Sequence, residues 1–65
     1  MFKKPKKILI VEDEKPLARA LELKLGHAGF ETKTVSDGEE ALSILKNEKF
    51  NLIILDLVIP KLLMR

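Results

Sequence analysis

Short apolar runs alternate with amphipathic stretches along this chain. Residues 8–11 and 52–55 are each four consecutive apolar residues, and each run leads directly into acidic residues. Runs of this kind are typical of strands buried on both faces of a parallel sheet. Residues 30–35 are more polar and alternate β-prone side chains, which predicts an edge strand. The pattern therefore predicts strands over residues 8–11, 30–35 and 51–57.

Two stretches between the predicted strands carry apolar residues at helical spacing. The first follows Pro16, which suits the first turn of a helix, and is expected to end near Gly26 or Gly29. The second follows a predicted turn at residues 36–38 and is expected to end near Asn47, with Asp37 and Glu40 at capping-box spacing. The apolar positions are Leu17, Ala18, Leu21, Leu25 and Ala28 in the first helix, and Ala41, Leu42, Ile44 and Leu45 in the second.

The predicted order is strand, helix, strand, helix, strand. Such alternation indicates the α/β class, with parallel strands joined by right-handed helical crossovers. The 65 residues allow one domain at most. The chain has no cysteine, so it cannot form a disulfide. A core this small can still be stabilised by a metal ion or by a second copy of the chain.

The net charge is only +2, and the first residues carry a lysine run at Lys3, Lys4, Lys6 and Lys7. Such a run can bind nucleic acid or anionic lipid, or it can be a solvated leader. We favour the leader, over residues 1–7, because no arginine or aromatic pattern accompanies it. We expect neither a nucleic-acid partner nor a membrane partner. With no visible signal peptide or membrane span, we expect a cytoplasmic protein.

Three acids at the ends of the apolar runs carry the candidate chemistry. Glu12 and Asp13 follow the first run, and Asp56 follows the third strand's run. Ligands of parallel α/β sheets bind beyond the carboxyl ends of the strands, so these carboxylates converge if the two strands are neighbours. Clustered carboxylates favour a hard cation such as Mg²⁺, and an aspartate can form an acyl phosphate. Alternatively, Asp13 or Glu14 serves only to cap the next helix.

Four segments together resemble the receiver domains of bacterial two-component response regulators. They are residues 8–14, 21–30, 36–42 and 50–60, within a stretch from about Lys7 to Pro60. The resemblance implies a flavodoxin-like fold with five strands in the order 2-1-3-4-5. This chain contains the first half of that fold, with strands in the order 2-1-3. It also implies a signalling module that is not an enzyme.

The resemblance also implies a role for particular residues. Asp56 corresponds to the aspartate of the receiver that accepts a phosphoryl group from a sensor histidine kinase. Glu12 and Asp13 correspond to the residues that hold Mg²⁺ together with Asp56. The backbone carbonyl of Val58 corresponds to a main-chain ligand of the metal, and Pro60 to the proline of the following loop.

The chain departs from the family after Pro60. Residues 61–65 lack the Asp-Gly that normally follows, and the hydroxyl and lysine residues that sense the phosphoryl group in later strands have no counterpart; Lys61 is in the wrong place. We therefore expect a truncated receiver: a leader at 1–7, a receiver-like part at 8–60 and a non-family tail at 61–65. A natural truncation, a frameshift and a deliberate fragment all remain open.

Half a receiver leaves the apolar strand over residues 52–55 as an exposed edge, which favours pairing with another chain. We expect a homodimer in which this strand pairs antiparallel with its mate, giving the order 2-1-3-3′-1′-2′. Exchange of a segment between the two chains is the alternative form of this dimer. Two functions follow as alternatives. One is a receiver module with a Mg²⁺ pocket and a phosphoacceptor aspartate. The other is a structural half-domain that forms a homodimer without signalling activity.

Overall fold

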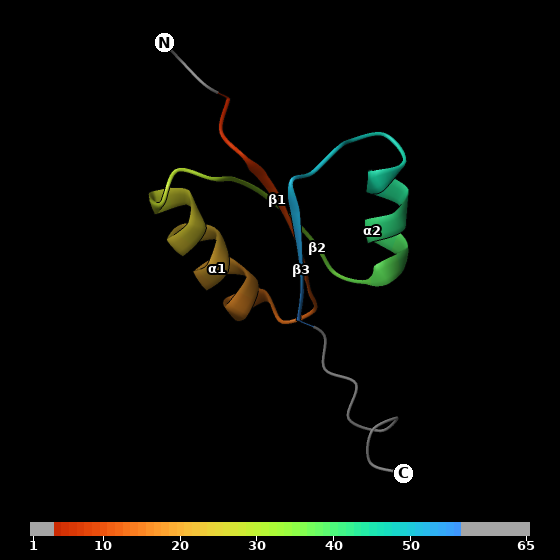
Figure 1. Cartoon of the computed structure of the whole chain (residues 1–65). Coiled ribbons are helices and arrows are strands. Elements are labelled where there is room, and N and C mark those ends of the chain that lie inside the picture. Colours follow the sequence, from red (N-terminus) through yellow and green to blue (C-terminus); the bar gives the residue numbers. More distant parts are fainter. Residues whose placement is uncertain (1–3, 57–65) are drawn as a thin grey trace.

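A computed structural model describes residues 4–56 of the chain, apart from the side chain of Asp56. The elements alternate as predicted (Figure 1). They are β1 (Lys7–Glu12), α1 (Lys15–His27), β2 (Glu31–Val35), α2 (Gly38–Leu45) and β3 (Leu52–Asp56). The part of the prediction that reaches Leu57 and beyond lies outside the described residues.

The three strands form one parallel sheet in the order β2-β1-β3. Ile10, in the middle of β1, is in register with Thr34 of β2 and with Ile54 of β3. The two helices lie on opposite faces of this sheet (Figure 1). The predicted α/β class and the 2-1-3 strand order are therefore confirmed, and the arrangement is that of the first half of a flavodoxin-like fold.

A glycine ends α1. Gly29 has a φ of 98° and donates its N–H to the carbonyl of Gly26 (3.0 Å), while Phe30 donates to Leu25 (3.0 Å). This pair of bonds is the Schellman arrangement, which satisfies carbonyls left over at a helix end. Its left-handed residue favours glycine, so Gly29 is the terminator that the sequence left open between two positions.

Asp37 caps α2 through its side chain. Its Oδ1 accepts the N–H of Glu40 at 2.9 Å, and the Glu40 carboxylate in turn accepts the N–H of Ser36 at 2.7 Å. The predicted capping pair is therefore present, but Glu40 reaches one residue further back than the usual capping box. Gly38 is the first helical residue and not part of the preceding turn.

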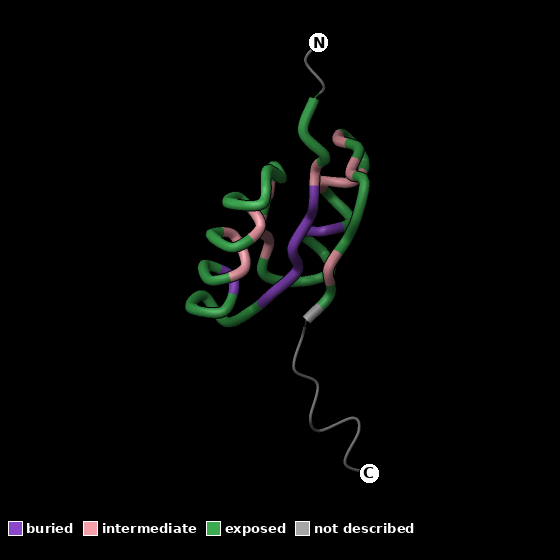
Figure 2. Tube along the Cα trace, turned by 60° about the vertical axis from the view of Figure 1, so that its left-hand side comes forward, coloured by how far each residue is buried: buried purple, intermediate pink, exposed green. Residues whose placement is uncertain are grey.

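The core is centred on β1. Its apolar residues, Ile8 to Val11, are at most 2% exposed, and Figure 2 shows burial concentrated along this strand. Leu9 and Val11 pack with Ala41 of α2 on one face, and Ala18 of α1 is buried. The side chains around the Leu9 cluster are Val35, Ile44, Leu45 and Phe50.

β3 is covered far less than β1. Leu52, Ile53 and Leu55 are 53%, 43% and 68% exposed. Among the described residues, no Cα atom of either helix comes within 8 Å of a Cα atom of β3. Both helices pack on β1 and β2 instead. The apolar run that predicts a strand buried on both faces is thus, among the described residues, the exposed edge strand of the sheet.

The amino-terminal ends of the strands are joined by an ion-pair network. The Lys7 ammonium lies 2.9 Å from one oxygen of the Glu48 carboxylate, and Lys33 lies 3.6 Å from the other. The Oδ1 atom of Asn51 accepts the N–H of Lys7 at 2.8 Å. The Lys7 ammonium also lies 4.9 Å from the centre of the Phe50 ring. Lys7 is the last residue of the lysine run and also the first residue of β1.

Candidate functional site

The carboxyl-terminal ends of β1 and β3 lie next to each other. Glu12 ends β1 and is in register with Asp56, the last residue of β3. Neighbouring strands of a sheet are separated by about 4.8 Å. Glu12 and Asp56, two of the three predicted site acids, therefore lie next to each other on neighbouring strands, although many residues separate them in the sequence.

Glu12 is a buried acid, with 3% of its surface exposed. Its Oε2 atom accepts the N–H of Glu14 at 3.0 Å, so the carboxylate is held against the β1–α1 loop. Buried carboxylates are stable only with such partners. The side chain also borders a hollow of about 340 Å³ on the α1 face, near Lys15 and Arg19.

Asp13 follows Glu12 at a bend and is exposed. The residue in the N-cap position of α1 is Glu14, and its side chain makes no capping hydrogen bond. The first turn of α1 contains no acidic residue. The alternative in which Asp13 or Glu14 serves as a side-chain cap for α1 is therefore not what the structure shows. Asp13 instead sits beside Glu12 at the carboxyl-terminal edge of the sheet.

The described side chains do not by themselves complete a metal site. Among them, no three Asp, Glu, His or Cys residues are grouped closely enough to hold a metal ion. Glu12 and Asp13 are in this described set, whereas the Asp56 side chain and all of Val58 lie outside it. The chemistry of Glu12 and Asp13 nevertheless fits a magnesium ion, since consecutive carboxylates offer the oxygen ligands that Mg²⁺ prefers.

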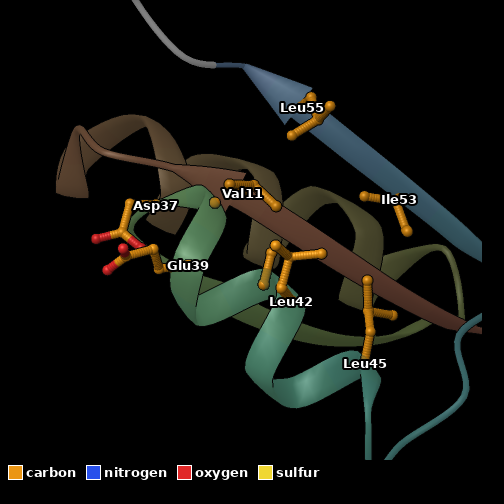
Figure 3. Close-up of a pocket in the computed structure, with 9 residues that line it drawn as sticks. Val11, Asp37, Glu39, Leu42, Leu45, Ile53 and Leu55 are labelled. Atoms are coloured by element: carbon orange, nitrogen blue, oxygen red, sulfur yellow. The ribbon is translucent and has the colours of Figure 1, made fainter.

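An apolar groove of about 730 Å³ separates α2 from β3 (Figure 3). Leu42 and Leu45 of α2 line one side, and Ile53 and Leu55 of β3 line the other. Leu42, expected on the apolar side of its helix, is 65% exposed here. The sequence indicated an exposed strand edge but not this groove. In the sequence, the groove is indicated only by the apolar face of α2. Among the described residues, this helix packs on β1 and β2.

The family model for the response regulator receiver domain matches residues 8–63. This match spans most of the chain and includes both acidic strand ends. The chain belongs to the response-regulator receiver family. Receiver domains are signalling modules, and response regulators interact with sensor kinases.

Curated relatives agree with this assignment. The chain is 50% identical over 56 residues to the probable transcriptional regulator ycf27 of Porphyridium aerugineum. It is 47% identical over 57 residues to the alkaline phosphatase synthesis transcriptional regulatory protein PhoP of Bacillus subtilis, and 47% identical over 55 residues to the response regulator ArlR of Staphylococcus aureus. No solved structure matches the chain.

These matches cover 86%, 88% and 85% of this chain but only 23%, 24% and 25% of the relatives, so this chain spans about a quarter of their length. Two of the three are named as transcriptional regulators, which leaves the expected absence of a nucleic-acid partner without support. Within residues 4–56, neither helix has the length and apolar character needed to cross a bilayer.

Proposed function

We propose that this receiver is a phosphoacceptor module in which Asp56 accepts a phosphoryl group from a sensor histidine kinase. Glu12, Asp13, Asp56 and the backbone carbonyl of Val58 are the proposed ligands of Mg²⁺. The observation that supports this most is the register of Glu12 with Asp56, which brings together the acidic ends of β1 and β3. Family membership supplies the class of reaction.

In the proposed reaction, a carboxylate oxygen of Asp56 attacks the phosphorus of a phosphohistidine on the kinase. A P–O bond forms, the P–N bond breaks, and the imidazole leaves with the electron pair, so that Asp56 becomes an acyl phosphate. Bound Mg²⁺ would neutralise charge on the phosphoryl oxygens and the clustered carboxylates.

The described residues prepare this site in two ways. The N–H of Glu14 fixes the Glu12 carboxylate at 3.0 Å, so one acidic ligand is oriented before any cation arrives. Asp13, beside it, is accessible from solvent. Such pre-orientation lowers the entropic cost of assembling a site. In this proposal the module works in the cytoplasm, where its kinase partner presents the phosphohistidine.

The second candidate is a structural half-domain that forms a homodimer and carries no signalling chemistry. The specific observation in its favour is the exposure of Leu52, Ile53 and Leu55 on a strand that neither helix covers. Apolar edges of this kind pair with other chains. The two candidates differ in one respect that can be measured directly, which is the response to Mg²⁺.

Thermal unfolding with and without Mg²⁺, at matched ionic strength, separates the candidates. Specific binding at 100 times Kd stabilises the folded state by about 2.7 kcal/mol, which raises the melting temperature. Glu12→Gln and Asp13→Asn are expected to remove that rise. Glu39→Gln, which removes an exposed acid from α2, is expected to retain it. No rise in the unmodified chain, or equal loss in all three variants, would exclude the proposed cation site and favour the structural half-domain.

A further inference from the structure

The charged residues are divided between the two ends of the sheet. Where the strands end, acids predominate: Glu12, Asp13, Glu14, Asp37, Glu39 and Glu40, beside Lys15 and Arg19. Where the strands begin, lysines predominate: Lys4, Lys6, Lys7, Lys24, Lys46 and Lys49, beside His27, Glu31 and Glu48. Between the ends lie Lys33, which pairs with Glu48, and Glu22, which pairs with Arg19. The small net charge of the chain therefore conceals one basic end.

Hydrogen bonds hold three segments of the chain together at this basic end. The N–H of Glu31, which follows α1, is bonded to the carbonyl of Lys6 at 2.9 Å. The N–H of Asn51, which follows α2, is bonded to the carbonyl of Lys7 at 2.8 Å. Both helices therefore end where the strands begin (Figure 1). The lysines of the amino-terminal run and those at the helix ends lie at the same end of the molecule.

Most of the positive charge at this end is available to an outside partner. The exposed lysines that make no ion pair with a described residue, which we call the basic cluster, are Lys4, Lys6, Lys24, Lys46 and Lys49. The two glutamates at this end have lysine neighbours, since Glu48 pairs with Lys7 and Glu31 is in register with it. A hollow of about 380 Å³, lined in part by Lys4 and Lys6, opens beside Asn51.

The fold also places an aromatic side chain next to the basic cluster. Phe30 directly precedes the Glu31 that is bonded to Lys6, and 37% of its surface is exposed. The ring of Phe50 lies at the same end but under the Lys7 ammonium, which is 4.9 Å from its centre. In the sequence α1 separates Phe30 from the lysine run, whereas the structure makes them neighbours.

Exposed lysines beside an exposed aromatic ring suit a single-stranded nucleic acid. Ammonium groups neutralise successive phosphates of the strand, and the ring offers a platform on which a base can stack. The basic cluster comes from three segments spread over one end of the molecule, which suits an extended row of phosphates. An anionic membrane would attract the same lysines, but its headgroups offer no base to stack on Phe30.

We infer that the basic cluster and Phe30 form a binding surface for single-stranded nucleic acid. The acids at the other end of the sheet repel the same partner, so the chain is oriented with its basic end toward the strand. The surface is separate from the candidate cation site at Glu12 and Asp13. The inference therefore goes beyond the proposed function and does not depend on phosphoryl transfer at Asp56.

Fluorescence anisotropy of a labelled oligothymidine, titrated with the complete chain over a range of salt concentrations, tests the role of the lysines. The unmodified chain is expected to bind, and its affinity is expected to fall steeply with salt. Lys4→Glu combined with Lys6→Glu is expected to weaken binding and to reduce the logarithmic salt slope by about 1.4, since each phosphate contact on a single strand contributes about 0.7.

The matched control is Lys15→Glu combined with Arg19→Glu, which makes the same change in net charge at the acidic end. This variant is expected to bind nearly as well as the parent. Circular dichroism verifies that both double variants are folded. No binding by the unmodified chain, or equal weakening in the two double variants, would overturn the inference.

Phe30→Leu tests the stacking role, because leucine keeps an apolar side chain but removes the ring. It is expected to weaken oligothymidine binding at least roughly fivefold. Unchanged binding by this variant would contradict the single-strand surface. Tighter binding of the unmodified chain to phosphatidylserine vesicles than to oligothymidine would also overturn the inference, since it would make the surface a membrane contact. Magnesium-induced stabilisation of the same variants reports separately on the cation site.

Discussion

Glu12 and Asp56 are partners in the last register pair between β1 and β3. Their proximity follows from the packing of β1, whose apolar residues are buried while the strand is hydrogen-bonded on both sides. A register slip of one residue would move every β3 side chain to the opposite face of the sheet. The geometry of the candidate site therefore depends on the same contacts that hold the core together.

The ion pair between Lys7 and Glu48 is expected to make stability depend on pH. The hydrogen bond from Lys7 lowers the pKa of the Glu48 carboxyl, with further help from the charges of Lys7 and Lys33. A lowered folded-state pKa means that this stabilisation is present above the unfolded value of about 4.3 and is lost as pH falls through the folded value. The same hydrogen bond raises the pKa of Lys7, so its contribution is lost at strongly alkaline pH.

Glu48→Gln tests this linkage. The variant is expected to have a lower melting temperature than the parent at pH 7, and the two curves are expected to converge as the pH approaches about 3. The effect is expected to be modest and to shrink in high salt, because both side chains are about one-third exposed. Curves that stay parallel over the whole acidic range would show that the ion pair does not contribute to folding stability.

The side-chain cap of α2 is expected to stabilise this short helix. Asp37→Ala removes the acceptor for the N–H of Glu40 and should lower the free energy of unfolding by about 1 kcal/mol. Asp37→Ser retains an acceptor at the cap and should recover most of that loss. Chemical denaturation of the three proteins gives the comparison. Equal stability of the alanine and serine variants would argue against the capping bond.

Burial predicts very different costs for the same substitution at two leucines. Leu9 is fully buried in β1, so Leu9→Ala should destabilise the fold by roughly 2–5 kcal/mol. Leu23 is half exposed on α1, and Leu23→Ala should change the free energy of unfolding by less than about 0.5 kcal/mol. Urea unfolding monitored by circular dichroism measures both. Similar costs at the two positions would mean that the core is not centred on β1.

Much of the fold was predictable because local patterns and the core agree. The run at residues 8–11 is continuously apolar, and β1 is indeed covered on both faces. The run at residues 52–55 has the same character but is largely exposed, since its cover depends on what lies beyond β3 and not on its own sequence. Periodicity identifies a strand and its preference for burial, but it does not supply the elements that bury it.

The candidate site was predictable to a similar extent. The acids at the strand ends and the parallel order together placed Glu12 beside Asp56, and the register agrees. The hydrogen bond from Glu14 to Glu12 was not predictable, because it depends on the exact path of the β1–α1 loop. The Lys7–Glu48 pair was missed for a related reason. It joins residues distant in sequence, and the lysine run gave no sign that its last member would be fixed.

The most direct test of the phosphoacceptor proposal is the intact mass of the chain after incubation with acetyl phosphate and Mg²⁺. The account predicts a slow gain of one phosphoryl group that requires Mg²⁺ and is absent in Asp56→Asn. The folded state of that variant is verified by circular dichroism. No gain in the unmodified chain, or an equal gain in Asp56→Asn, would contradict the assignment of Asp56 as the phosphoacceptor.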